Sequence, residues 1–123
     1  MAIERALSRE QNENRAELPA AYTKAHDVEF RLSGRDGGQV WVHVYTFADA
    51  EARKDPQALC MNKETVKCSL ADFARIGAPT GWTADEIKAA AYRFLKSLPG
   101  VDPKPDPVNP KTDLPARFAG KDV

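Results

Sequence analysis

The stretch Gln39-Val40-Trp41-Val42-His43-Val44-Tyr45-Thr46-Phe47 decides the predicted fold, because it reads as a strand that is apolar on both faces. Side chains alternate along a strand with a period of two, so the three valines point one way and the aromatic row points the other. A small antiparallel sheet normally buries one face and leaves the other in water. A strand with two apolar faces needs two covers, and a chain of 123 residues has limited means of supplying both.

The segment before this strand predicts a hairpin, and the length of its turn decides which row faces the core. Residues from Val28 alternate apolar with polar and lead into a Gly-rich turn that contains Asp36-Gly37. A two-residue loop at this dipeptide would turn the aromatic row toward the core, and this is the register we favour. A loop one residue longer exchanges the faces, so that the valines line the core and Trp41 lies beside Arg31. Both registers leave an apolar row on the second face.

The middle of the chain predicts short elements. The expected order is a helix at residues 48–54 before Pro56, two short strands at 59–61 and 65–70 around Asn62-Lys63, and a helix at 70–76 ended by Gly77. In a hairpin of that kind Cys60 faces Thr65 and Cys68 faces Gln57, so the two thiols are not disulfide partners.

The last helix has the clearest signals in the sequence. Thr83 and Glu86 form a capping box, and Trp82 and Ile87 have the spacing of a hydrophobic staple. A Pro-Gly pair ends the helix at position 99. The apolar stripe consists of Ile87, Ala90, Ala91, Phe94, Leu95 and Leu98. We therefore predict an α+β fold, in which a small antiparallel sheet of three to four strands is packed by one C-terminal amphipathic helix over residues 83–98.

Composition divides the chain into three zones. Residues 1–25 are polar and are predicted to form an N-terminal arm, and residues 26–98 hold most of the apolar pattern and are predicted to be the globular domain. Residues 99–123 contain six of the nine prolines and predict an extended tail. We expect both ends to be mobile in the isolated protein and to become ordered on a neighbouring subunit. The tail offers Val108, Leu114 and Phe118 as apolar contacts for docking.

Charge and cysteine content exclude several classes of function. Lys plus Arg and Asp plus Glu cancel at 18 each, so the chain lacks the basic excess of a nucleic-acid-binding protein. No apolar run approaches the ~18 residues needed to span a membrane, and the N-terminus does not resemble a secretory signal. Two cysteines without a disulfide pattern indicate a reducing compartment, and therefore a cytosolic protein.

The residues that carry chemistry are too scattered to predict a reaction. His26, His43, Cys60 and Cys68 match no zinc-binding spacing. The glycines of the hairpin turn join two strands, whereas a phosphate-binding loop precedes a helix. The aromatic row could stack bases, but on the neighbouring strand only Arg31 is basic. We accordingly predict no catalytic, cofactor or metal site, no nucleic-acid or membrane partner, and no enzymatic activity.

The chain resembles, in overall style, small structural-module proteins of tailed bacteriophages. The resemblance rests on Gly37-Gly38-Gln39-Val40-Trp41-Val42-His43-Val44-Tyr45, on Trp82-Thr83-Ala84-Asp85-Glu86-Ile87 and on the Pro-rich end. It implies a non-enzymatic assembly component of a virion, at the tail or the head–tail junction, which is present in the host cytoplasm during assembly. Its partners would be other protein subunits, in a homo- or hetero-oligomer.

An alternative from another class is a small soluble inhibitor or adaptor that binds one host protein through the face of the sheet. Either function makes the two-faced strand and the tail the candidate protein interface. The candidate residues are Val40, Trp41, Val42, His43, Val44, Tyr45, Val108, Leu114 and Phe118.

Overall fold

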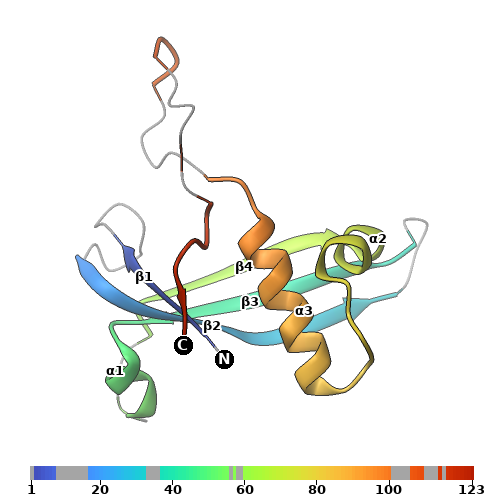
Figure 1. Ribbon diagram of the computed structural model, residues 1–123, viewed down its shortest axis with the longest axis horizontal. Coiled ribbons are helices and arrows are strands. Elements are labelled where there is room, and N and C mark those ends of the chain that lie inside the picture. The colour runs from blue at the N-terminus through green and yellow to red at the C-terminus, as the bar shows by residue number, and fades with distance from the viewer. Residues whose placement is uncertain are drawn as a thin grey trace.

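A five-stranded antiparallel sheet forms the body of the protein in the computed structural model, with strand order β4-β3-β2-β1-β5 (Figure 1). The structure describes residues 2–7, 17–32, 37–55, 57, 60–100, 106–109, 114 and 116–123. The strands are β1 (Ile3–Leu7), β2 (Leu18–Arg31), β3 (Gln39–Phe47), β4 (Asn62–Ser69) and β5 (Lys121–Asp122). The predicted α+β class with an antiparallel sheet is confirmed, but the sheet has five strands rather than three or four.

The register of β2 and β3 buries the valines and leaves the aromatic row outside. Val42 pairs with Val28, and Val40, Val42 and Val44 are completely buried. Trp41 pairs with Glu29, whereas a two-residue loop at Asp36-Gly37 would have paired it with Leu32. The predicted two-residue loop is therefore wrong. The observed partner of Trp41 lies three residues before the predicted one, and a shift by an odd number of residues exchanges the core-facing and outward-facing rows of the strand. The alternative register, with a loop one residue longer, correctly placed the valines in the core and the aromatic row outside. Residues 33–36, which include Asp36, lie outside the described residues.

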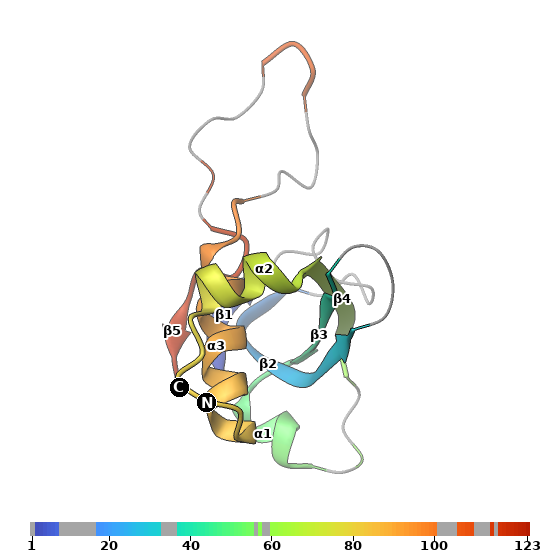
Figure 2. The ribbon, with the colours of Figure 1, turned by 90° about the vertical axis from the view of Figure 1, so that its right-hand side faces the viewer.

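Helix α3 (Ala84–Ser97) covers the valine side of the sheet. Viewed end-on in Figure 2, the strands form an arc with α3 on its concave side. The Thr83 hydroxyl accepts a hydrogen bond from the Glu86 backbone N–H, as the capping box predicts. The Glu86 carboxylate accepts from the Thr83 hydroxyl, whereas the capping box predicts a bond to the Thr83 backbone N–H. Trp82 is 76 % exposed, and its ring lies edge-on to Phe30 with centroids 6.0 Å apart. The buried residues of α3 are Ile87, Ala90, Ala91, Tyr92, Phe94 and Leu95.

The remaining helices are short. Helix α1 (Ala50–Lys54) begins at Asp49, whose carboxylate accepts from the backbone N–H of Ala52. Helix α2 (Leu70–Asp72) continues into the π-helical turn η2 (Phe73–Gly77), close to the predicted helix at 70–76. Gly77 permits η2 to approach α3, because a Cβ there would lie 2.9 Å from the carbonyl oxygen of Ala90. Among the described residues, no helix is long and apolar enough to cross a bilayer.

Strand β4 replaces the hairpin predicted around Asn62-Lys63. It runs without interruption from Asn62 to Ser69 and pairs with β3 over its whole length. Cys68 therefore lies opposite Val40 rather than Gln57, and both Cys68 and Cys60 are free thiols. Asn and, to a lesser degree, Lys are depleted in strands, but here the long β3 offers a continuous partner and the pairing outweighs that local preference. Leu59, in the first predicted strand, lies outside the described residues.

Both ends of the chain join the sheet. The sheet therefore includes residues of the predicted arm (1–25) and of the predicted tail (99–123). Strand β5 pairs with β1, and Ala2 and Val123 exchange two backbone hydrogen bonds of 2.9 and 3.0 Å, so the termini lie side by side (Figures 1 and 2). Phe118 is completely buried in the main core, where Ile3 is also found. The pairing is between residues more than a hundred positions apart, which composition cannot reveal. Much of the predicted arm and tail, residues 8–16, 101–105 and 110–113, lies outside the described residues.

Candidate functional site

The candidate site is the outer face, which we define as the side of β2, β3 and β4 that points away from the valine row. Its centre is the predicted aromatic row Trp41, His43 and Tyr45, and all three residues are partly exposed. Cross-strand pairing places charged residues on both sides of this row. The outer face comprises Asp27, Glu29 and Arg31 of β2, Gln39, Trp41, His43 and Tyr45 of β3, and Lys63, Thr65 and Lys67 of β4.

Trp41 lies between two cations that come from the two neighbouring strands. The guanidinium carbon of Arg31 is 3.7 Å from the centroid of the indole, and the Lys67 ammonium is 4.0 Å from it. The indole N–H donates to the Gln39 side chain at 3.2 Å. Each cation–π contact at an exposed position is worth about 0.5–1 kcal/mol. These long side chains are thus the second cover that the two-faced strand required.

Tyr45 has a similar arrangement at the other end of the row. The His26 ring stacks on it with centroids 4.0 Å apart and planes 6° from parallel, and the Lys63 ammonium lies 5.1 Å from its centroid. The register of β2 shifts between Ala25 and Asp27, which leaves His26 as the extra residue of a bulge. Bulges redirect a side chain, and this one brings His26 onto Tyr45. Partial burial and the nearby Lys24 lower the pKa of His26.

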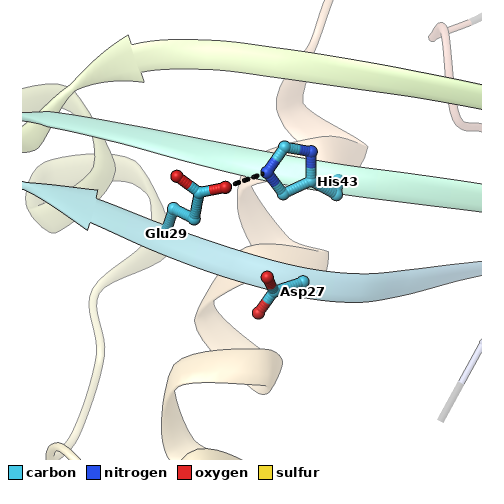
Figure 3. Close-up of side chains that lie close together, drawn as sticks. All are labelled: Asp27, Glu29 and His43. Carbon is cyan, nitrogen blue, oxygen red and sulfur yellow. Dashed lines mark hydrogen bonds and ion pairs between the residues drawn. The ribbon is translucent and has the colours of Figure 1, made fainter.

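His43 links all three strands at the middle of the row (Figure 3). Its Nε2 lies 2.7 Å from a Glu29 carboxylate oxygen, and its Nδ1 lies 2.9 Å from the Thr65 hydroxyl. Hydrogen bonding from His43, with a further contribution from Arg31, lowers the pKa of Glu29. Arg31 is 3.2 Å from the second carboxylate oxygen of Glu29. Together the four residues form a hydrogen-bonded chain across the sheet.

A hydroxyl, an imidazole and a carboxylate in sequence also form the arrangement that activates nucleophiles in hydrolases. Here the nitrogens are used in the opposite sense to the serine-protease template, because Nδ1 faces the hydroxyl and Nε2 faces the carboxylate. The Glu29 carboxylate is shared with Arg31, and Thr65 is exposed. The geometry therefore fits a cross-strand link better than a nucleophilic centre.

Asp27, Glu29 and His43 could also offer ligand atoms to a cation, since one such atom from each lies within 4.8 Å of the others. His43 and Glu29 already use the ligand atoms that a cation would need. Both nitrogens of His43 have partners, Glu29 is bonded through both oxygens, and Asp27 accepts from the Val28 backbone N–H at 2.9 Å. Cation binding would break at least the bond between His43 and Glu29, so these residues fit a metal poorly.

The other predicted interface residues do not share this surface. Val40, Val42 and Val44 lie in the core and cannot contact a partner, because α3 covers their side of the sheet. Phe118 is likewise buried, which corrects its assignment as a docking contact of the tail. Val108 is 81 % exposed and Leu114 is partly buried.

The sequence pattern did not predict the position of the two lysines of the outer face. Lys63 and Lys67 reach it only because β4 is one continuous strand, whereas a turn at Asn62-Lys63 was predicted. The available signal was the alternation of Lys63, Thr65 and Lys67 with Asn62, Glu64, Val66 and Cys68. No protein-family model, curated protein or solved structure gave a significant match to this chain. The functional proposal therefore depends on the residues of the outer face.

Proposed function

We propose that this protein is a non-enzymatic component of a larger protein assembly and that its outer face binds an acidic segment of a partner protein. The observation that carries the proposal is the position of Trp41, partly exposed between Arg31 and Lys67. Tryptophan, tyrosine and arginine are the residues most enriched at binding hot spots, and all three occur on this face.

The charge of the outer face favours an acidic partner. Its three cations, Arg31, Lys63 and Lys67, exceed its two carboxylates, Asp27 and Glu29, by one positive charge. Glu29 is already paired with Arg31 and hydrogen-bonded to His43. Lys67 is exposed, and among the described residues its side chain contacts the Trp41 ring and no carboxylate. A carboxylate of a partner could pair with Lys67 while an apolar side chain beside it covers the indole edge. Complementary charge of this kind raises association rates and selects the partner.

A nucleic acid fits the same surface less well. Bases bind to aromatic residues by stacking on an open ring face. Arg31 and Lys67 lie over Trp41, and His26 and Lys63 lie over Tyr45, so these rings already have partners within the chain. Base stacking would have to displace them, whereas a protein segment can add contacts at the ring edges.

The stylistic resemblance to structural modules of tailed phages is our reason for proposing a virion as the assembly. The alternative of a soluble inhibitor or adaptor uses the same face with a single partner. The two differ in stoichiometry: a virion component sediments with a large particle in many copies, and an adaptor forms a small complex with one partner molecule.

The test begins with a photo-crosslinking amino acid in place of Gln39, at the exposed rim of the outer face, in the native host. The crosslinked partner is then purified and its affinity is measured by titration calorimetry. We expect Trp41→Ala and Lys67→Glu each to weaken binding by about tenfold or more, as hot-spot substitutions do. The control is Lys121→Glu on β5, which makes the same change of charge away from this face and should leave the affinity unchanged.

The proposal fails if the purified partner binds both outer-face variants as tightly as the unmodified protein. It also fails if the crosslinked molecule is an RNA or DNA.

A further inference from the structure

A cavity of about 300 Å³ lies beside β2. None of the residues listed above for the outer face lines it, but its Lys24 pairs with Tyr45 across β2 and β3, so the cavity adjoins that face. Three elements contribute to the cavity, and the elements can be followed in Figure 1. Its lining consists of Tyr22, Lys24 and Ala25 of β2, Arg53 of α1, and Asp85, Lys88 and Tyr92 of α3.

The charges of this cavity are unbalanced. Lys24, Arg53 and Lys88 are positive and Asp85 is the single carboxylate among the lining residues, which leaves an excess of two positive charges. None of the three cations forms an ion pair with a carboxylate in the part of the chain that the structure describes. Partial burial lowers the pKa of Lys24, and repulsion from Arg53 and Lys88 lowers it further. The cations are therefore close enough to repel one another, and an anion among them would relieve that repulsion.

A buried hydrogen bond joins two of the residues that line the cavity. Ala25 and Tyr92 are buried, and the Tyr92 hydroxyl accepts a hydrogen bond from the Ala25 backbone N–H at 2.9 Å. This bond occurs at the β2 bulge and joins the strand to α3. Burial raises the pKa of Tyr92, the hydrogen bond from Ala25 opposes this effect, and the nearby Tyr22 adds to it. Cations from three separate elements thus line the same cavity as this hydrogen bond, Lys24 partly buried and Arg53 and Lys88 exposed.

We propose that this cavity binds a small organic phosphate, with the phosphate group between Lys24, Arg53 and Lys88. A phosphomonoester carries a charge of about −1.5 to −2 at neutral pH and so balances the excess, whereas a carboxylate would neutralise only part of it. Arginine and lysine are the side chains that proteins use most for phosphate. The volume is at the lower end for small-molecule sites, which run from about 300 to 1,000 Å³. Asp85 is positioned to accept a hydrogen bond from a hydroxyl or amino group of the same ligand.

The experiment titrates the full chain with glycerol 3-phosphate at constant ionic strength and follows backbone amide resonances by NMR. We expect saturable shifts at Ala25 and Lys88. Glycerate, which has a carboxylate in place of the phosphate, should bind about tenfold more weakly because it carries one charge fewer. Lys24→Gln and Arg53→Gln should each weaken binding by about tenfold, the effect of one charge-assisted hydrogen bond.

Lys121→Gln on β5 is the matched control, because it removes one positive charge from an exposed site outside the cavity. It should leave the affinity within about twofold, since exposed charges at a distance are screened by salt. Circular dichroism confirms that each variant is folded. The proposal is overturned if glycerol 3-phosphate gives no saturable shift, if glycerate binds equally well, or if Lys121→Gln weakens binding as much as Lys24→Gln. Loss of the outer-face function would not affect any of these measurements.

Discussion

The Tyr92 hydroxyl on α3 accepts a hydrogen bond from the backbone N–H of Ala25 on β2, at a distance of 2.9 Å. Ala25 precedes the β2 bulge, so its N–H is directed to the helix at the point where the register with β3 shifts. The bond therefore joins α3 to β2 at the bulge that places His26 on Tyr45 and beside the cationic cavity.

Removal of this hydroxyl should destabilise the fold. Tyr92→Phe keeps the ring but leaves the buried Ala25 N–H without its acceptor, which costs about 1–3 kcal/mol. Urea denaturation monitored by circular dichroism measures the loss. Tyr45→Phe is the control: its ring lies on the outer face, and removal of its hydroxyl should change the free energy of unfolding by less than about 0.5 kcal/mol. If Tyr92→Phe lowers the free energy of unfolding no more than Tyr45→Phe does, the bond between Tyr92 and Ala25 does not stabilise the fold.

Two adjacent residues at the end of η2, Gly77 and Ala78, should change the stability of the protein in opposite directions when substituted. In Gly77→Ala the new Cβ would lie 2.9 Å from the Ala90 carbonyl oxygen, and overpacking of this kind costs about 1–3 kcal/mol. Ala78 has a left-handed backbone with φ of 44°. Ala78→Gly should stabilise the protein by roughly 0.5–1 kcal/mol, because the left-handed penalty exceeds the entropy cost of glycine. Thermal unfolding of both variants checks the signs, and destabilisation by Ala78→Gly would contradict the assigned conformation.

Substitution of Phe118 and of Val108, two apolar residues of the predicted docking tail, should have very different effects on the free energy of unfolding. Phe118 is fully buried, so Phe118→Ala should cost about 3–5 kcal/mol of stability. Val108 is 81 % exposed, and Val108→Ala should change stability by less than about 0.5 kcal/mol. Both are measured on the isolated protein by chemical denaturation. If Phe118→Ala unfolds at the same denaturant concentration as the unmodified chain, residues 116–123 do not belong to the core.

Stability should fall in acid partly through Glu29. Hydrogen bonding from His43 and the contacts with Arg31 lower the pKa of this carboxyl from its ordinary value of 4.5 in the folded protein. The ionised carboxylate therefore stabilises the folded state above the unfolded pKa, and that stabilisation is lost as the pH falls through the folded pKa. Glu29→Gln should lose less stability than the unmodified protein between neutral pH and the region below 4.5. If the free energies of unfolding of the two proteins, measured in urea, fall by the same amount with pH, Glu29 does not contribute to the acid sensitivity.

The parts of the fold that could be predicted are those with local signals. The N-cap at Thr83 and the apolar stripe of α3 lie within one segment. The structure contains the N-cap hydrogen bond and buries five of the six stripe residues, whereas Leu98 is only partly buried and Tyr92 is buried in addition. The strand Gln39–Phe47 has the predicted bounds because its alternation is continuous. The sequence identified the row Trp41, His43 and Tyr45 of the candidate site. It did not identify the charged neighbours of this row, because they lie on β2 and β4, whose register against β3 is set by turns and by pairing between strands.

The sequence by itself determined that β3 has two apolar rows and that a capped helix is available to cover one of them. Only the tertiary structure decided which row the helix covers and what covers the other. The physical reason is that register and edge pairing are set by contacts between distant segments, such as β5 with β1 and Phe118 with the core around Ile3. The valines became the core, and the aromatic row became a surface covered by Arg31, Lys63, Lys67 and His26.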